Sequence, residues 1–119
     1  IILFLVLMNF IVVFVTTPTE KDAKKIARKI VDEGLAACVS IVDKVKSIFY
    51  WEGKIEKARE AMLIIKTRNE KFNQLMDHIK SIHPYTVPEI LAIPILAGNP
   101  EYLKWVEDST RRKEEKIQN

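Results

Sequence analysis

An expected helix and an expected strand are joined by the segment His83-Pro84-Tyr85-Thr86-Val87-Pro88-Glu89-Ile90, and the other predicted elements are located relative to it. Pro84 keeps His83 out of the α region and Pro88 cannot donate to a β-ladder, so the segment is expected to run extended with rigid corners. An imidazole, a phenol and a carboxylate held this stiffly suit a binding site. A proline-stiffened connection whose Tyr85 covers a subunit or core edge explains the segment equally well.

The residues on either side of this segment show two different periodicities. Before it, apolar side chains keep helical spacing from Phe72 to Ile82, and Thr67-Arg68-Asn69-Glu70 has the pattern of a capping box that starts this helix. After it, residues 90–96 are apolar and flanked by prolines, which predicts a strand at a sheet edge or with a bulge.

The N-terminal half predicts a strand, a helix and a long hairpin. Residues 10–15 are β-branched and aromatic without alternation, as in a central strand buried on both faces. Thr17-Pro18-Thr19-Glu20 then predicts a helix with Thr17 as its N-cap, and Gly34 ends that helix. A second strand, long and bulged, runs from residue 35 to Trp51, and a turn at residues 52–54 leads to a third strand that ends at Thr67.

A last, short helix begins at Asn99-Pro100-Glu101, and a charged, frayed tail is expected from Arg111 onward. The element order is therefore βαββαβ plus a C-terminal helix. This order predicts an α+β, ferredoxin-like fold with two helices on one face of an antiparallel sheet. The other face also reads as apolar, so we expect subunits to assemble and cover it.

Composition narrows the classes of function. The chain has 119 residues, enough for one domain, and its net charge of +3 is too small and too dispersed to indicate a nucleic-acid partner. The Lys- and Glu-rich composition is typical of thermostable proteins. Cys38 is the single cysteine, which excludes an intramolecular disulfide and favours a cytoplasmic location.

The apolar N-terminal run is too short for a membrane span, which needs about 20 residues, and it lacks the flanks of an export signal. We interpret Met8 as the natural or an alternative start. We therefore divide the chain into an apolar extension at 1–7, a domain at 8–110 and a charged tail at 111–119. We expect removal of the extension to leave the fold intact, and we expect no membrane partner.

Several of these motifs together resemble the CutA family of divalent-cation tolerance proteins, over residues 10–109. The motifs are Ala36-Ala37-Cys38-Val39, Ser47-Ile48-Phe49-Tyr50-Trp51-Glu52-Gly53-Lys54-Ile55, Leu63-Ile64-Ile65-Lys66-Thr67, His83 to Ile90, and Tyr102-Leu103-Lys104-Trp105. The resemblance implies a ferredoxin-like homotrimer, similar in build to the PII signalling proteins, that binds copper.

The resemblance also suggests which residues form sites. Cys38, Trp51, Lys66, His83, Tyr85, Glu89 and Trp105 match recurrent positions of the family. Thr86 stands where the family commonly has Glu or Gln. Val15 and Ile82 stand where some members have a cysteine and a second histidine, both proposed copper ligands.

Two hypotheses about sites follow. In the first, His83 and Glu89 bind a divalent metal, copper above all, although a single histidine does not make a transition-metal site. In the second, a ligand cleft contains Cys38, Trp51, Lys66, Tyr85 and Trp105, with Lys66 beside Tyr85 and Glu89 to hold an anion.

Three of these site residues also have a structural explanation. Cys38 suits a small buried side chain, Lys66 a solvated strand end, and Trp51 a packing contact at the hairpin tip. His78, the other histidine, is expected to be solvated on the polar side of its helix.

The resemblance therefore implies a trimeric, non-catalytic divalent-cation tolerance protein that binds copper or another divalent metal. The alternative is a PII-like sensor of a small anion at clefts between subunits. An RNA-binding ferredoxin-like module is a third possibility, with Phe10 and Phe14 as base-stacking residues, although Met62-Leu63-Ile64-Ile65 offers no aromatic side chain. No Gly-rich phosphate loop, HExxH, CxxC or Ser/His/Asp pattern suggests an enzyme.

Overall fold

The computed structural model describes residues 9–118; the predictions made for residues 1–7 and for Met8 lie outside this part of the chain. Its elements follow the predicted order. They are β1 (Phe10–Thr17), α2 (Glu20–Asp32), β2 (Cys38–Trp51), β3 (Lys54–Arg68), a 3₁₀ turn η1 (Asn69–Lys71), α3 (Phe72–Ile82), β4 (Ile90–Pro94) and α4 (Pro100–Gln118).

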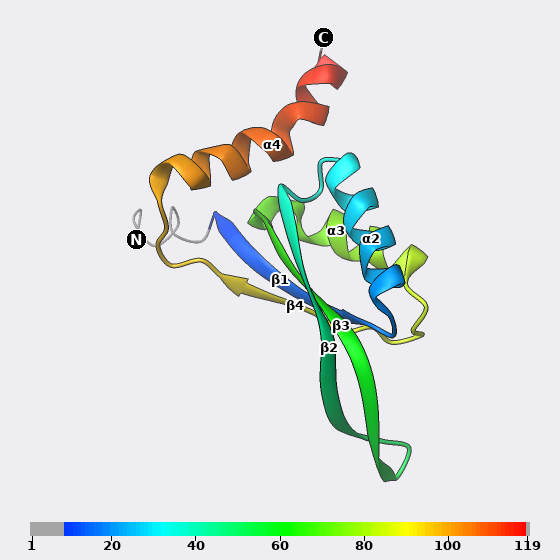
Figure 1. Ribbon diagram of the computed structural model, residues 1–119. Coiled ribbons are helices and arrows are strands. Elements are labelled where there is room, and N and C mark those ends of the chain that lie inside the picture. The colour runs from blue at the N-terminus through cyan, green and yellow to red at the C-terminus, as the bar shows by residue number, and fades with distance from the viewer. Residues whose placement is uncertain (1–8, 119) are drawn as a thin grey trace.

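The four strands form one antiparallel sheet in the order β2-β3-β1-β4. Helices α2 and α3 lie side by side on one face of this sheet, and α4 crosses near the ends of the strands (Figure 1). This arrangement confirms the α+β, ferredoxin-like fold. It leaves β2 and β4 as the two free edges of the sheet.

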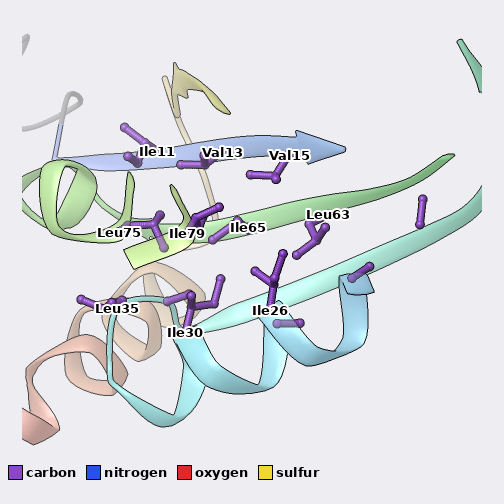
Figure 2. Close-up of a cluster of buried hydrophobic side chains, with 14 residues drawn as sticks. Ile11, Val13, Val15, Ile26, Ile30, Leu35, Leu63, Ile65, Leu75 and Ile79 are labelled. Atoms are coloured by element: carbon purple, nitrogen blue, oxygen red, sulfur yellow. The ribbon is translucent and has the colours of Figure 1, made fainter. Parts of the chain in front are cut away.

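The core lies between the sheet and the two covering helices (Figure 2). Alternate residues of β1 and β3 point into it and meet the apolar stripes of α2 and α3. Its largest members are Ile11, Val13, Val15, Ile26, Ile30, Leu35, Leu63, Ile65, Leu75 and Ile79.

The opposite face of the sheet is less covered than the sequence predicted. Phe10, Val12 and Phe14 of β1 are only partly buried within this chain, so the prediction of a strand buried on both faces is wrong for the single chain. On β4, Leu91 and Ile93 are 58% and 51% exposed. The uncovered apolar face matches the expectation that another surface is needed to bury it.

The predicted long, bulged hairpin is confirmed. Pairing of β1 with β3 ends at Thr17 and Ala61, whereas β2 and β3 remain paired as far as Trp51 and Lys54, with a bulge between Val42 and Val45. Glu52 and Gly53 close the hairpin with φ of 49° and 83°, the positive values that a two-residue type I′ turn requires. We call residues 45–60, which extend beyond the rest of the sheet, the distal hairpin (Figure 1).

Both predicted capping boxes are wrong in detail. Thr17 is still part of β1 and donates a hydrogen bond to the Thr19 carbonyl (2.8 Å), so Thr19 caps α2 by accepting from the Asp22 N–H (3.1 Å). Thr67 pairs within the sheet and donates its hydroxyl proton to the Leu35 carbonyl (2.8 Å). In both cases the strand extends as far as the threonine. Because that residue is extended and paired within the β-sheet, it cannot be the N-cap of the helix that follows.

The C-terminal end is more ordered than predicted. Asn99 caps α4 as expected, accepting from the Glu101 N–H at 3.1 Å, but the helix continues to Gln118 instead of fraying at Arg111. Its last turns are anchored: Glu114 pairs with Arg68 (3.1 Å) and Lys71, and Arg112 donates to the Val31 carbonyl. No helix within residues 9–118 is long and apolar enough to cross a membrane.

Candidate functional site

His83 ends α3 and is nine-tenths buried, with both of its ring nitrogens in hydrogen bonds. The Tyr85 N–H donates to Nδ1 (2.9 Å), and Nε2 lies 2.7 Å from the Thr16 carbonyl oxygen. Because a carbonyl only accepts, Nε2 must carry the proton and Nδ1 must be the acceptor. The imidazole therefore ties the end of α3 to the end of β1 and fixes the start of the 83–89 segment.

Tyr85 points its hydroxyl group at a carboxylate that the sequence analysis did not single out. Its Oη donates to Glu60 Oε2 at 2.9 Å. Burial, followed by the hydrogen bond to Glu60 and the negative charge of that carboxylate, raises the pKa of Tyr85 to about 12. Tyr85 is therefore a neutral hydrogen-bond donor across the physiological range.

A cavity of about 690 Å³ lies beside this pair, between the distal hairpin and the 83–89 segment. We call it the hairpin cavity. Its volume is within the range of small-molecule sites. Three parts of the chain line it: Thr16 at the end of β1; Ser47, Ile48, Phe49, Trp51, Glu56, Lys57 and Glu60 from the hairpin; and Tyr85, Thr86, Val87 and Glu89 from the segment.

The charged groups of the hairpin cavity are mainly acidic. Glu56, Glu60 and Glu89 face one lysine, Lys57, and Glu56 also has Lys54 at 3.4 Å. Glu60 is only 7% exposed. Among the residues that the structure describes, neither Glu60 nor Glu89 forms an ion pair. The cavity is therefore suited to a positively charged ligand.

The structure separates the predicted site residues into two groups. Trp51, Tyr85 and Glu89 line the hairpin cavity. His83 is not part of the lining, but it accepts a hydrogen bond from the Tyr85 N–H and so holds the segment that forms one wall. Lys66 pairs with Val12 on β1, whereas the cavity residue Thr16 pairs with Met62. Four residues of strand separate these positions by about 13 Å. Within one chain Lys66 therefore does not lie beside Tyr85 and Glu89, and a cleft that brings them together between subunits remains a prediction.

The second group lies at the opposite end of the sheet. Cys38 pairs with Lys66 across the two strands, and the Lys66 ammonium donates to Ser40 Oγ at 2.8 Å. Trp105 packs against Tyr102 with ring centroids 5.5 Å apart. Burial and the neighbouring Cys38 thiol raise the pKa of Tyr102. Tyr102 thus brings α4 next to Cys38 of β2, and none of these residues lines the hairpin cavity.

The described residues do not form a metal site within one chain. No three His, Cys, Asp or Glu side chains among them converge on a point, and both nitrogens of His83 are occupied. His78 does not add a ligand either. Contrary to the prediction that it is solvated, its Nε2 atom is buried and has no hydrogen-bond partner within the described chain.

Sequence reasoning missed Glu60 and Thr16. The position of Glu60 gives a signal, because it directly precedes the apolar run at residues 61–65 of β3, whose alternate side chains are buried and where an unpaired carboxylate is unusual. Thr16 contributes its backbone carbonyl to His83, and nothing in a side-chain pattern indicates such a contact.

Comparison with known proteins places the chain in a family. Residues 11–109 match the model of the CutA1 divalent ion tolerance protein family. The divalent-cation tolerance protein CutA of Thermus thermophilus is 46% identical over 99 residues, which are 83% of this chain and 96% of the relative. The chloroplastic CutA 1 of rice (Oryza sativa) is 48% identical over 101 residues, 85% of this chain.

Solved structures agree with these matches. The crystal structure of CutA1 from Oryza sativa superposes with a TM-score of 0.85 at 46% identity, covering 87% of this chain and 95% of that one. The periplasmic divalent cation tolerance protein CutA of Archaeoglobus fulgidus gives 0.83 at 44% identity, covering 85% and 98%. The chain spans just over half the length of the rice and Arabidopsis thaliana relatives, 57% and 56%. The match extends over nearly the whole ferredoxin-like domain, and the chain belongs to the CutA1 family of divalent ion tolerance proteins.

Proposed function

We propose that this protein is a homotrimeric divalent-cation tolerance protein that binds copper or another divalent metal and catalyses no reaction. The observation that carries the proposal is the acidic hairpin cavity, where the exposed carboxylate of Glu89 has no cationic partner within the described chain. Carboxylates without counter-ions attract cations. Membership of the CutA1 family supports a role connected with divalent cations.

The distal hairpin supports assembly into a homotrimer. A two-stranded hairpin is at best marginally stable in water unless it packs against another surface. This hairpin exposes Ile48 (69%), Tyr50 (67%), Trp51 (52%) and Ile55 (73%). A hairpin that covers the open sheet face or the β4 edge of the next copy makes a head-to-tail contact, and such contacts form a ring when the rotation between copies closes. The number of copies in this assembly, three, is what the resemblance to the CutA family implies.

Metal binding places a specific demand on His83. Ligation by Nδ1 would require the Tyr85 N–H to leave that atom, and ligation by Nε2 would require loss of the proton that bonds to Thr16. Glu89 is exposed at the cavity and needs no such change. His83 and Glu89 remain our proposed copper ligands. Because ligation must break one of the two hydrogen bonds of the imidazole, we expect an affinity no tighter than micromolar, about −8 kcal/mol.

Copper titration tests this proposal. Calorimetry at a pH above 6.5, the usual imidazole pKa, compares the native protein with Glu89→Gln, His83→Ala and the exposed control Glu101→Gln. We expect Cu(II) to bind more tightly than Zn(II) or Mn(II), as for any N/O site, and both site variants to bind more weakly than the control. Equal copper affinity in all four proteins would contradict both ligand assignments.

The PII-like anion sensor is less favoured by this geometry. Its proposed anchor, Lys66, lies at the other end of the sheet and donates to Ser40, and the hairpin cavity has three carboxylates for one lysine. An anionic ligand would meet like charge there.

A cytoplasmic location also remains a prediction. Relatives with chloroplastic and periplasmic names show that the family occurs in other compartments. Nucleic acid and membrane partners remain unexpected on the grounds of net charge and sequence pattern.

A further inference from the structure

Glu60 is a buried carboxylate without a counter-ion in the described chain. It is 7% exposed, and the only hydrogen bond of its side chain among the described residues comes from the neutral phenol of Tyr85. Carboxylates are almost never buried to this extent unless they are paired, because desolvation of the charge is unfavourable. We propose that the hairpin cavity binds a small organic ammonium ion, whose charged group completes the pairing of Glu60.

The geometry favours an ammonium group over a metal ion at this position. A transition metal needs several converging ligands, and no three suitable side chains of the described residues converge. An ammonium group brings its own N–H donors and needs only one carboxylate with nearby acceptors or aromatic faces. Tyr85 already donates to one oxygen of Glu60, which orients the carboxylate.

The remaining walls of the cavity suit an extended, partly apolar molecule. Trp51, Phe49 and Tyr85 supply aromatic rings, against which a cation is attracted by the quadrupole of the ring. The exposed carboxylate of Glu89 lies on the same wall as Tyr85 and has no ion pair in the described chain, so it offers a second anionic contact. Two separated carboxylates in a cavity of about 690 Å³ fit a linear di- or polyamine.

The same ammonium chemistry has a second source, a lysine side chain from a neighbouring copy in the assembled protein. We assign the cavity to a free small molecule, because the two carboxylates and the aromatic rings that would hold its charged groups all come from one chain. The experiment must separate these two sources. This inference goes beyond metal binding, and the two are tested with different probes.

Spermidine titration of the 119-residue chain provides the test. In a Trp105→Phe background, Trp51 is the only tryptophan and reports on the cavity by fluorescence. We expect a saturable change with spermidine but not with the neutral probe 1,4-butanediol or the dianion succinate. Glu60→Gln keeps the shape of the side chain and removes its charge, and should weaken spermidine binding about tenfold or more. The matched control Glu101→Gln, which changes the same charge on exposed α4, should leave it unchanged.

Two further measurements make each outcome decisive. Circular dichroism melts establish that Glu60→Gln is folded; if it is not, Tyr85→Phe combined with Glu89→Gln replaces it, and that pair should weaken binding severalfold. Light scattering of each variant reports assembly.

Unchanged spermidine affinity in the folded cavity variant overturns the proposal, as does the absence of saturable binding. Loss of assembly in Glu60→Gln without spermidine binding to the native protein would assign the cationic group to a neighbouring copy and also overturns it. Copper binding without spermidine binding would leave the proposed function standing and refute this inference alone.

Discussion

His83 connects three segments of the chain through a single imidazole ring: the end of α3, the Thr16 carbonyl of β1 and the Tyr85 N–H. The sequence identified His83 and Tyr85 as important because prolines restrict the backbone around them. It did not identify their partners. Hydrogen bonds to Thr16 and Glu60 depend on the register of strands that are far apart in sequence, and local patterns carry no information about that register.

Replacing His83 tests its structural role. We expect His83→Ala to lower the free energy of unfolding by about 2–4 kcal/mol, because it leaves the Thr16 carbonyl and the Tyr85 N–H unpaired and creates a cavity. Urea denaturation measures this loss. The control His78→Ala should stay within about 1 kcal/mol of the native protein, since the Nε2 atom of His78 has no partner in the described chain to lose. Equal effects for the two variants would contradict the structural role of His83.

Tyr85 gives a prediction about alkaline pH. Its pKa is raised to about 12 in the folded protein, above the usual value of about 10 in the unfolded chain. The unfolded state therefore loses the phenolic proton first, so the stability that Tyr85 contributes is complete below about pH 10 and is lost as the pH rises toward 12.

Thermal melts between pH 9 and pH 12 measure this effect as a difference from Tyr85→Phe, which has no phenolic proton. The gap in melting temperature between the two proteins should shrink across this range. The exposed Tyr50→Phe serves as the control, and its offset from the native protein should stay constant. A gap for Tyr85→Phe that does not change with pH would argue against a buried, neutral phenol.

Helices and strands were predicted better than their ends. Apolar spacing located the elements because burial of one face is the main constraint on an amphipathic segment. The caps at Thr17 and Thr67 were misplaced because both threonines are used by the sheet, where Thr17 pairs with Ala61 and Thr67 with Ile11. The length of α4 was also missed, since its last turns are held by contacts with β3, η1 and α2 that no local pattern reveals.

The end of α4 offers a test of the predicted boundary at residue 110. The Lys71 side chain is only 9% exposed and pairs with Glu114, and Arg68 at 3% exposed pairs with the same carboxylate. We expect Glu114→Gln to lower the free energy of unfolding at pH 7 by about 1–3 kcal/mol, because a buried charge loses its partner. Truncation after Thr110 should cost at least as much.

The pH dependence distinguishes this ion pair from a general packing effect. The hydrogen bond from Lys71, followed by the positive charges of Lys71 and Arg68, lowers the pKa of Glu114. Its contribution is therefore present above the usual glutamate pKa of about 4.3 and is lost as the pH falls through the lower folded value. Urea melts of native protein and Glu114→Gln should converge below about pH 4. A difference that persists in acid would mean that the charge of Glu114 is not responsible.

At the scale of the whole molecule, the fold was predictable and the cavity was not. The order βαββαβ restricts the chain to few topologies, so the sheet order followed from the element order. The hairpin cavity instead combines Thr16, the distal hairpin and the 83–89 segment, and its charge depends on Glu60 facing inward. For the same reason no local pattern shows that Lys66 and Tyr85 lie at opposite ends of the sheet within one chain.

Light scattering on the 119-residue chain at micromolar concentration tests the central claim, which is that other copies of the chain cover the exposed distal hairpin and the open sheet face. We predict a mass of about three times the 13.8 kDa of one chain. Ile55→Asp places a charge on a side chain that is 73% exposed in the single chain, so it should shift the protein toward monomer without unfolding the core. A stable, soluble monomer of the native protein at this concentration would contradict the account.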